Sequence, residues 1–297
     1  MKIGFIGLGR MGLNMVYNLL DHKQKVVGYN RHPEPTRKAM RKGAEGAFSI
    51  KEMIAKLAKP RIVWLMVPAG KPTDAVLTES LRFLKKGDII IDGGNSFFKD
   101  SQRRYKKCQK KGVHFLDCGT SGGMGGARHG ACMMIGGDRA VFKKIEPIFR
   151  AMCLPKGYGY MGTSGAGHFV KMVHNGIEYG MMGAINEGME ALRKHQPAFG
   201  WDMKTVAQVY AHGSIIESRL MSWLYNSFQI KGYLDQISCE VPKGETEEEM
   251  AKLEKLAPMP ILHEARCMRV NSRKGRGCSQ YIAAMRNQFG GHKVKKK

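Results

Sequence analysis

The sequence predicts an α/β protein in which a doubly wound parallel sheet is followed by an all-helical domain. Short apolar runs alternate with amphipathic helical patterns through the first half of the chain. A glycine-rich turn follows the first of those runs, and from residue 165 onwards only helical patterns occur. We therefore expect a sheet domain over residues 1–163 and a helical domain over residues 164–297.

The strands of the first domain are predicted from runs that are short, apolar and bounded by turn-forming or charged residues. They cover residues 2–6, 25–29, 61–67, 88–92, 113–117 and 131–137. Helical patterns lie between the early runs, at residues 11–22 and 49–58. This alternation is typical of parallel strands that are connected by helices.

The second domain shows helical periodicity throughout. Thr163 and Ser164 are suitable caps for its first helix. The acidic run GETEEEM is predicted to open a later helix, since negative charge is favourable at a helix N-terminus. The expected helices cover residues 165–194, 202–211, 214–228, 246–256, 260–271 and 278–288.

Composition sets the broad class of the protein. Among 297 residues, 43% are hydrophobic, which is typical of a globular chain. The longest apolar runs are far shorter than a membrane span, and the N-terminus resembles a strand more than a signal peptide, so we expect a cytoplasmic protein. The seven cysteines are odd in number and form no Cys-x-x-Cys pair, which argues against a zinc site and a disulfide framework.

The formal net charge of +24 permits three interpretations. The densest basic runs are RRYKKCQKK at residues 103–111 and HKVKKK at the C-terminus. The simplest interpretation is a solvated helix face and a frayed tail. A nucleic-acid surface and a basic site for an anionic small molecule are the alternatives.

The motif GLGRMG, at residues 7–12, predicts a dinucleotide site. It matches G-x-G-x-x-G, it follows a strand directly and it opens a helix, whereas glycines that serve only a turn need no such context. In this motif the first glycine permits a tight turn, the second admits a pyrophosphate and the third lets helix and strand pack closely. The residues expected to contact the cofactor here are Gly7, Leu8, Gly9, Arg10, Met11 and Gly12.

The end of the second strand predicts the cofactor type. A carboxylate at this place would hold a ribose hydroxyl of NAD, but this chain has Asn30 and Arg31. A guanidinium can bind the 2′-phosphate of NADP with two hydrogen bonds. We therefore expect NADP, with NAD as the alternative, unless Arg31 is only an exposed charge. Val67 and Asn95 are further expected cofactor contacts.

One helix carries an unusual set of polar residues. Lys171, His174, Asn175 and Glu178 stand at i, i+3, i+4 and i+7, which places them on one helix face. Such a face on an isolated helix is more often a solvated surface. Here apolar and glycine-rich segments surround it, so we expect it to be buried, and buried ionisable groups need partners or a chemical task.

Together these features resemble the 6-phosphogluconate dehydrogenase family in its short form and, more distantly, the 3-hydroxyacid dehydrogenases. The resemblance covers nearly the whole chain. Its most specific segments are DCGTSGGMGGARHG and GAGHFVKMVHNGIEYG. Further similar segments are GLGRMGLN, DGGNS, HGSIIESRL, HEARCMRVNSR and RNQFGGH.

The resemblance implies an oxidative decarboxylation of 6-phosphogluconate to ribulose 5-phosphate and CO2, in the pentose phosphate pathway and gluconate metabolism. Lys171 is implied as the base at the 3-hydroxyl, and Glu178 as the acid that protonates carbon 1. As a base, Lys171 must be neutral, so its pKa has to fall from roughly 10.4. The implied substrate contacts are Asn95, Ser121, Gly122, Gly123, His174, Asn175, Tyr179, Arg266, Arg286 and His292.

The resemblance also implies a homodimer or homotetramer in which Arg286 and His292 reach the substrate of a neighbouring subunit. No metal, membrane or nucleic-acid partner is implied. One segment departs from the family pattern: CEVPKGETEEEM stands where a Gly-Lys/Arg-Trp-Thr stretch is expected, and Lys243 is the candidate for the missing cation. The alternatives that stay open are a non-decarboxylating 3-hydroxyacid dehydrogenase and a nucleic-acid-binding protein that kept the fold.

Overall fold

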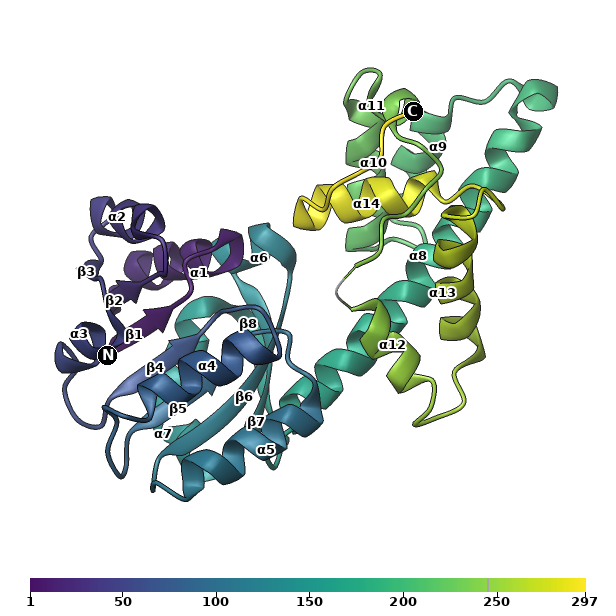
Figure 1. The fold of residues 1–297 in the computed structure, drawn as a ribbon. Helices are drawn as coiled ribbons and strands as arrows, with labels where there is room; N and C mark the ends of the chain where they lie inside the picture. Colours follow the sequence, from purple (N-terminus) through teal and green to yellow (C-terminus); the bar gives the residue numbers. More distant parts are fainter. Residues whose placement is uncertain (245) are drawn as a thin grey trace. The chain divides into compact units, whose positions relative to one another are not determined.

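The computed structural model describes residues 1–244 and 246–297 (Figure 1). Glu245, part of the acidic run expected at a helix N-terminus, lies outside the described residues. The chain divides into two compact units, Met1–Lys171 and Met172–Lys297. The predicted division after residue 163 lies earlier in the chain, and it stays a prediction about the functional domains.

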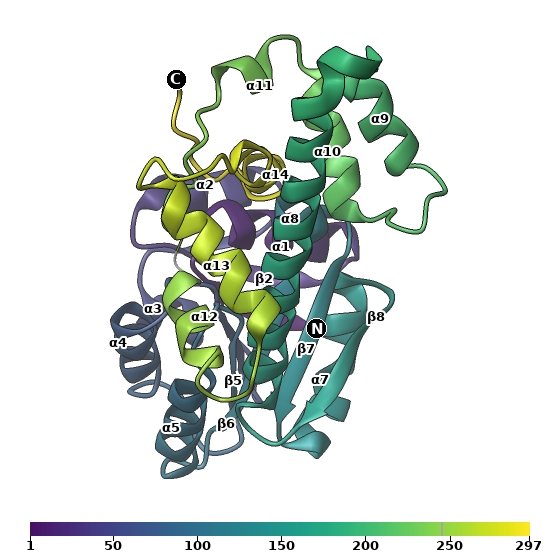
Figure 2. The same ribbon diagram turned by 90° about the vertical axis from the view of Figure 1, so that its right-hand side faces the viewer.

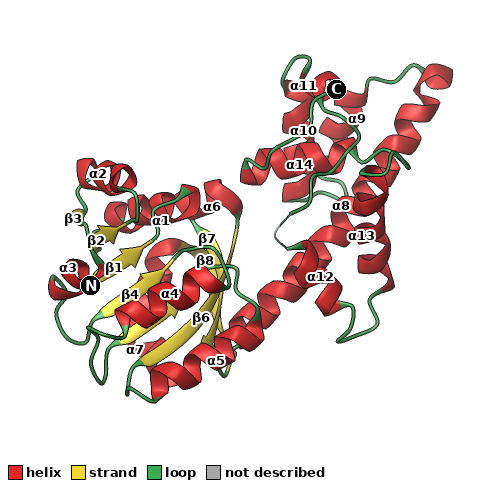
Figure 3. Ribbon diagram, in the orientation of Figure 1, coloured by secondary structure: helices red, strands yellow, loops and turns green. Residues whose placement is uncertain are grey.

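The first unit is a sheet covered by helices. Its strands are β1 Lys2–Ile6, β2 Lys25–Tyr29, β3 Glu45–Ala47, β4 Ile62–Leu65, β5 Ile89–Asp92, β6 His114–Ser121, β7 Ala131–Gly137 and β8 Cys153–Gly162. Its helices are α1 Arg10–Asp21, α2 Pro33–Arg41, α3 Ile50–Ala55, α4 Lys71–Ser80, α5 Phe98–Gln109, α6 Gly123–His129 and α7 Arg139–Met152. As the colouring by secondary structure shows, every named strand of the described chain lies in this unit (Figure 3).

The strand order, β3-β2-β1-β4-β5-β6-β7-β8, confirms the predicted α/β class. The pairing is parallel except between β6 and β7. The sequence did not predict β3, which has only three residues, or β8. The second omission has a physical reason: β8 contains Pro155 and several glycines, which are typical of turns. A proline is tolerated there because β8 is an edge strand.

Successive residues of the central strands point into two different cores. On β4, Trp64 belongs to the layer that α1 and α7 cover, whereas Val63 and Leu65 belong to the layer that includes α3 and α4. Trp64 is fully buried and stacks on Phe5 with ring centroids 5.9 Å apart. The period of two in the strands therefore gives the sheet two apolar faces, and helices cover both.

The second unit is helical. The helix α8 Ala166–Phe199 begins in the first unit and continues into the second, and the other helices are α9 Met203–Tyr210, α10 Arg219–Gln229, α11 Tyr233–Gln236, α12 Glu247–Leu253, α13 Pro260–Ser272 and α14 Gln280–Gly290. All six predicted helices occur. The one expected from residue 214 begins instead at Arg219, because the Ser218 hydroxyl accepts a hydrogen bond from the Met221 N–H and caps the helix there.

Glycines on α8 let neighbouring helices approach it. A Cβ added at Gly176 would lie 3.1 Å from Leu253 of α12, and one at Gly183 would lie 3.2 Å from Ala265 of α13. Figure 2 shows α13 lying along α8. Each glycine costs about 1 kcal/mol of helix stability relative to alanine, and this close packing is the reason that glycine is favoured at these two positions.

A disulfide corrects one expectation. Cys239 and Cys278 are bonded, with Cα atoms 4.4 Å apart, and they join the segment after α11 to the start of α14. The two residues are 39 positions apart, so the spacing rule that argued against a disulfide framework had no means of finding this pair. Throughout residues 1–244 and 246–297, no helix is long and apolar enough to cross a membrane.

Candidate active site

The turn from β1 to α1 needs its glycines. Gly7 has a φ of +97°, and a Cβ there would overlap the Met66 carbonyl oxygen. A Cβ at Gly12 would overlap the Gly7 carbonyl oxygen, so strand and helix are in direct backbone contact. A Cβ at Gly9, by contrast, would meet nothing within 4 Å. Gly9 is the residue before α1, and the first turn of α1 has no acidic residue, so this N-terminus suits an anion.

The residues after β2 close this turn from the other side. The Asn30 side chain accepts a hydrogen bond of 3.0 Å from the Leu8 N–H and donates one to the His32 carbonyl. Arg31 is exposed, and no carboxylate in the described ranges forms an ion pair with it. Arg10 and Met11 begin α1, and Val67 follows β4 beside Gly7. These residues fit the phosphates of a nicotinamide dinucleotide.

Asn95 lies in a loop that buried charges hold in place. Asp92, at the end of β5, accepts hydrogen bonds from the Ser96 hydroxyl and from the Gly94 N–H. Arg104, fully buried on α5, donates to both Asp92 and Ser96. The segment from 92 to 96 is therefore fixed on both sides of Asn95.

His168 joins this loop to the start of α8. Its Nε2 lies 2.9 Å from the Gly94 carbonyl oxygen and can only donate there. Its Nδ1 lies 2.7 Å from the Ser101 hydroxyl. The ring is 2% exposed, so both contacts are shielded from water. The sequence analysis did not single out His168, although it stands one helical turn before Lys171.

The first turn of α8 is docked against β6. The Asp117 carboxylate accepts hydrogen bonds from the N–H groups of Gly165 and His168, at 2.6 and 2.9 Å. A Cβ at Gly119 would overlap the Lys171 side chain. Lys171 is consequently held against the sheet and is 9% exposed. The expected burial of this lysine is thus present in the structure.

The rest of the predicted helix face follows along α8. His174 lies 3.3 Å from Asn175 Oδ1 and 3.9 Å from Glu178 Oε2, both measured from its Nδ1. Asn175 is buried, whereas His174 and Glu178 are partly exposed. A separation of seven residues places Lys171 and Glu178 about 10 Å apart along the helix axis.

A cluster of buried cations surrounds Tyr179. The Arg269 guanidinium lies 3.3 Å above the centre of the Tyr179 ring, and the Tyr179 hydroxyl is 3.0 Å from that of Thr246. Arg269 is 2% exposed, and its Nε has no hydrogen-bond partner among residues 1–244 and 246–297. Burial is the main reason that the pKa of Arg269 falls to about 10, and the positive charge of Arg286 contributes in the same direction.

Arg286 is the second cation of this cluster. It donates to the Pro242 carbonyl oxygen of its own chain at 2.7 Å, and burial lowers its pKa. No carboxylate in the described part of the chain forms an ion pair with Arg269 or Arg286. The negative charges of Glu178 and Glu247 act on both arginines, but among the described residues neither carboxylate lies within ion-pair distance. Two desolvated guanidinium groups without a contacting counter-ion suit a dianionic ligand.

The other predicted cations lie elsewhere. Arg266 is held by Glu254 through two hydrogen bonds of 2.6 and 3.0 Å. Lys243 pairs with Glu248 at 3.1 Å. Arg269 was not predicted from the sequence. It stands three residues after Arg266 in the same motif, and only the packing of the folded chain shows which of the two arginines is buried beside Tyr179. His292 follows α14, and its ring meets Phe289 edge-on.

The Ser121-Gly122-Gly123 segment connects β6 to α6. Ser121 is the last residue of β6. Gly122 and Gly123 have φ values of +116° and +62°, which L side chains rarely adopt. The chain can make this turn at low cost because both residues are glycine.

Two family models match the chain. The NAD binding domain of 6-phosphogluconate dehydrogenase matches residues 2–165, and the C-terminal domain of the same enzyme matches residues 167–198. The chain is 45% identical over 301 residues to the Bacillus subtilis protein YqeC, provisionally named a 6-phosphogluconate dehydrogenase, and all of both chains is covered. It is 37% identical to an NAD(+)-dependent, decarboxylating 6-phosphogluconate dehydrogenase of Haloferax volcanii, covering 100% of this chain and 99% of the other.

Solved structures give the same result for the fold. The Plasmodium falciparum 6-phosphogluconate dehydrogenase, studied with NADP+ and with 6-phosphogluconate, matches with a TM-score of 0.83 and 32% identity. The match covers 93% of this chain and 62% of that one. A 3-hydroxyisobutyrate dehydrogenase of Mycobacterium tuberculosis matches with a TM-score of 0.71 and 20% identity, over 96% and 98% of the chains, which shows a shared fold.

Proposed function

Because the chain belongs to the 6-phosphogluconate dehydrogenase family of NAD(P)-dependent oxidoreductases, we propose that it oxidises and decarboxylates 6-phosphogluconate. The products are ribulose 5-phosphate and CO2. The observation that carries the proposal is the pair of buried guanidinium groups beside Tyr179. A substrate without a phosphate would leave these two cations buried and without a contacting carboxylate among the described residues.

Lys171 acts first in the proposed reaction. In its neutral form it accepts the proton of the 3-hydroxyl, while a bound nicotinamide would accept the hydride from carbon 3. The product is a β-keto acid. When its carboxylate leaves as CO2, the electron pair moves toward the carbonyl, and the Lys171 ammonium returns its proton to that oxygen.

Glu178 acts second. Loss of CO2 leaves an enediol, which needs a proton on carbon 1 to become ribulose 5-phosphate. The protonated carboxyl of Glu178 supplies it to carbon 1 of the product, which was carbon 2 of the substrate, while neutral Lys171 takes back the proton of the hydroxyl on the neighbouring carbon. The spacing along α8 suits these two roles, since about 10 Å separates the backbones of Lys171 and Glu178. Their side chains can therefore reach carbon 3 of the substrate and the neighbouring carbon that becomes carbon 1 of the product. Asn175 and His174 are proposed to bind substrate hydroxyls, with Asn95, Ser121, Gly122 and Gly123.

The phosphate is proposed to bind Tyr179, Arg269 and Arg286. A dianion would supply the hydrogen-bond acceptor that Arg269 Nε lacks in the described part of the chain. Arg266 remains the prediction from the family motif, but its guanidinium is engaged with Glu254. We therefore assign the phosphate to Arg269 ahead of Arg266.

NADP is the proposed cofactor, with NAD as the alternative. Arg31 is exposed after β2 and has no carboxylate partner within the described ranges, so it is available for a 2′-phosphate. Asn30 cannot repel such a phosphate and already orders the glycine turn through Leu8.

The setting of the reaction is part of the proposal. We propose a cytoplasmic enzyme of the pentose phosphate pathway and of gluconate metabolism. It would assemble as a homodimer or homotetramer in which His292 serves a neighbouring subunit. The family motif assigns Arg286 to the neighbouring subunit as well, whereas its contact with Pro242 favours the phosphate site of its own chain.

The test is to follow reduction of NADP and NAD with 6-phosphogluconate while trapping released CO2. Gluconate, which lacks the phosphate, is the matched control substrate, and 3-hydroxyisobutyrate tests the alternative. Equal amounts of NADPH and CO2 from 6-phosphogluconate, with little reaction of the other two, are expected. Reduction without CO2 release would identify a non-decarboxylating 3-hydroxyacid dehydrogenase instead.

A further inference from the structure

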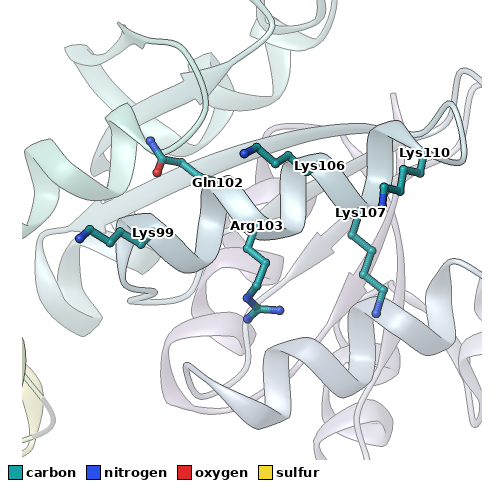
Figure 4. Close-up of a pocket in the computed structure, with 6 residues that line it drawn as sticks. All are labelled: Lys99, Gln102, Arg103, Lys106, Lys107 and Lys110. Atoms are coloured by element: carbon teal, nitrogen blue, oxygen red, sulfur yellow. The ribbon is translucent and has the colours of Figure 1, made fainter.

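The outer face of α5 carries a stripe of positive charge. Between residues 99 and 111 the chain has seven lysines and arginines and one aspartate. At about 100° per residue, the five exposed cations of α5 and its C-terminal end fall within a stripe about 100° wide. Figure 4 shows the shallow hollow that the side chains on this face line: Lys99, Gln102, Arg103, Lys106, Lys107 and Lys110.

Two of these cations are used within the protein. Arg103 forms ion pairs with Asp74 of α4 and with Asp100, and Lys107 donates to the Thr78 hydroxyl on α4. Lys99, Lys106 and Lys110 have no such partner: within residues 1–244 and 246–297, no carboxylate pairs with any of them. Lys110 stands eleven positions after Lys99, which corresponds to about 16 Å along a helix.

Helix stability does not explain the stripe. Cations near the C-terminus of α5, such as Lys106, are favourable to the helix dipole, but Lys99 stands in the first turn, where a cation is unfavourable. Lys99 and Arg103, and likewise Lys106 and Lys110, are like charges four residues apart, which destabilises a helix. The opposite face of α5 is buried and includes Arg104 and Cys108, so the stripe is the only solvent-facing side of α5.

The stripe continues beyond the helix. Gly112 packs against Lys86, since a Cβ at Gly112 would lie 2.8 Å from Lys86 Cγ. The neighbouring Lys85 and Lys86 are both exposed. The basic surface therefore extends from Lys99 past Lys110 to the loop before β5.

We propose that this surface binds the phosphate backbone of duplex nucleic acid. Lysine is depleted at protein–protein interfaces, where aromatic side chains and arginine are enriched, so the composition favours phosphates over a protein partner. None of the six lining residues is aromatic, which favours contact with the backbone over stacking on single strands. None is apolar, so the face has nothing to insert into a bilayer. A solvated helix face was the simplest interpretation of this run from the sequence, and a nucleic-acid surface was one of its two alternatives.

The experiment measures binding of the full chain to a fluorescently labelled duplex of about two helical turns (~20 base pairs) at several salt concentrations. The test variant is Lys99→Gln, Lys106→Gln and Lys110→Gln combined. Loss of three phosphate contacts should reduce the slope of log affinity against log salt by about 2.7 and weaken binding about 100-fold near 0.15 M salt. Dehydrogenase activity should not change, since none of the three belongs to the proposed active site.

A second triple variant controls for net charge. Lys194→Gln, Lys204→Gln and Lys255→Gln remove the same charge from exposed positions of the second unit. Little effect is expected, because none of these three lysines belongs to the proposed surface, and salt screens charges that do not contact the duplex. Equal losses in the two triple variants would mean that net charge alone attracts the duplex, and the proposal would fail.

Two further measurements keep the test independent of folding. Neutralising like charges should leave the melting temperature unchanged or raise it, whereas a lower melting temperature would assign these lysines to the fold. In the unaltered protein, the duplex should protect Lys99, Lys106 and Lys110 from acetylation, read by mass spectrometry. Full reactivity at saturating duplex, or binding to phosphatidylserine–phosphatidylcholine vesicles but not to the duplex, would overturn the proposal.

Discussion

Each of the two units buries an arginine, and the two arginines differ in their hydrogen-bond and ion-pair partners. In the first unit, Arg104 is fully buried and donates to Asp74, Asp92, Ser96 and the Gly70 carbonyl. In the second, Arg269 is 2% exposed, lies over the Tyr179 ring and donates to the Met182 sulfur, and among the described residues its Nε has no hydrogen-bond partner.

The difference distinguishes a cation whose charge is compensated within the fold from a cation that is a candidate to bind a ligand. Burying a charge is expensive unless it is paired and hydrogen-bonded. Arg104 meets that condition within the protein and fixes the loop that carries Asn95. Arg269 does not meet it, and burial lowers its pKa to about 10. A buried cation that its own chain leaves uncompensated is the stronger candidate for a ligand contact.

The largest expected effect concerns a third buried cation, Lys171, which should affect chemistry and not stability. Lys171→Met should lower kcat by about 10²–10⁴-fold, because the 3-hydroxyl loses its base. NADP binding and the urea midpoint should stay close to those of the unaltered protein. Steady-state kinetics and titration of NADP by fluorescence measure both. A variant that keeps more than about half of its kcat would remove Lys171 from the mechanism.

Arg104→Met tests whether Arg104 stabilises the fold. Removing one partner of a buried ion pair leaves Asp92 uncompensated and should lower the free energy of unfolding by about 3–5 kcal/mol. The neighbour Arg103 is the matched control: its side chain is 52% exposed, and Arg103→Met should cost at most about 1 kcal/mol. Equal shifts of the two urea midpoints would contradict the structural role of Arg104.

Arg269→Met tests the proposed binding role of Arg269. Removal of a buried, uncompensated charge should not destabilise the protein, but loss of a charged hydrogen bond to the phosphate should cost about 1.5–3 kcal/mol of binding, or about 10- to 150-fold in KM for 6-phosphogluconate. Arg266→Met is the comparison variant. If it raises KM more than Arg269→Met does, the assignment from the family motif is the better one.

Arg31→Asp extends the comparison to an exposed cation. The substitution replaces a proposed clamp on the 2′-phosphate with a repelling charge, so NADP should weaken relative to NAD by about 10- to 150-fold. KM values for both cofactors give the ratio. An unchanged preference would show that the turn after β2 does not select the cofactor.

The smallest expected signal comes from mixing two inactive variants. If Arg286 and His292 both serve a neighbouring subunit, as the family motif implies, Lys171→Met and the double variant Arg286→Ala, His292→Ala should together recover about a quarter of normal activity after subunit exchange. About half of the dimers are then mixed, and each has one complete site. Arg286 also lies near Tyr179 and Arg269 of its own chain. Absence of recovery, with exchange verified by mass, would assign it to that chain's own site.

Local patterns were sufficient for much of the fold and for part of the candidate site. The glycine turn at residues 7–12 was predictable because steric demands on φ and close packing act on the residues themselves. The face of Lys171, His174, Asn175 and Glu178 followed from helical periodicity alone. The alternation of strand and helix gave the α/β class, which the sheet confirmed.

Tertiary packing decided what the local pattern left open. Arg266 and Arg269 stand one helical turn apart in the same motif, but only Arg269 meets Tyr179, because α13 turns that side toward α8 and the other toward Glu254. The Cys239–Cys278 bond and the link from His168 to the Gly94 loop join residues 39 and 74 positions apart. Such partners are set by the folded chain as a whole, since sequence spacing constrains contacts within one helix or turn and says little about contacts between them.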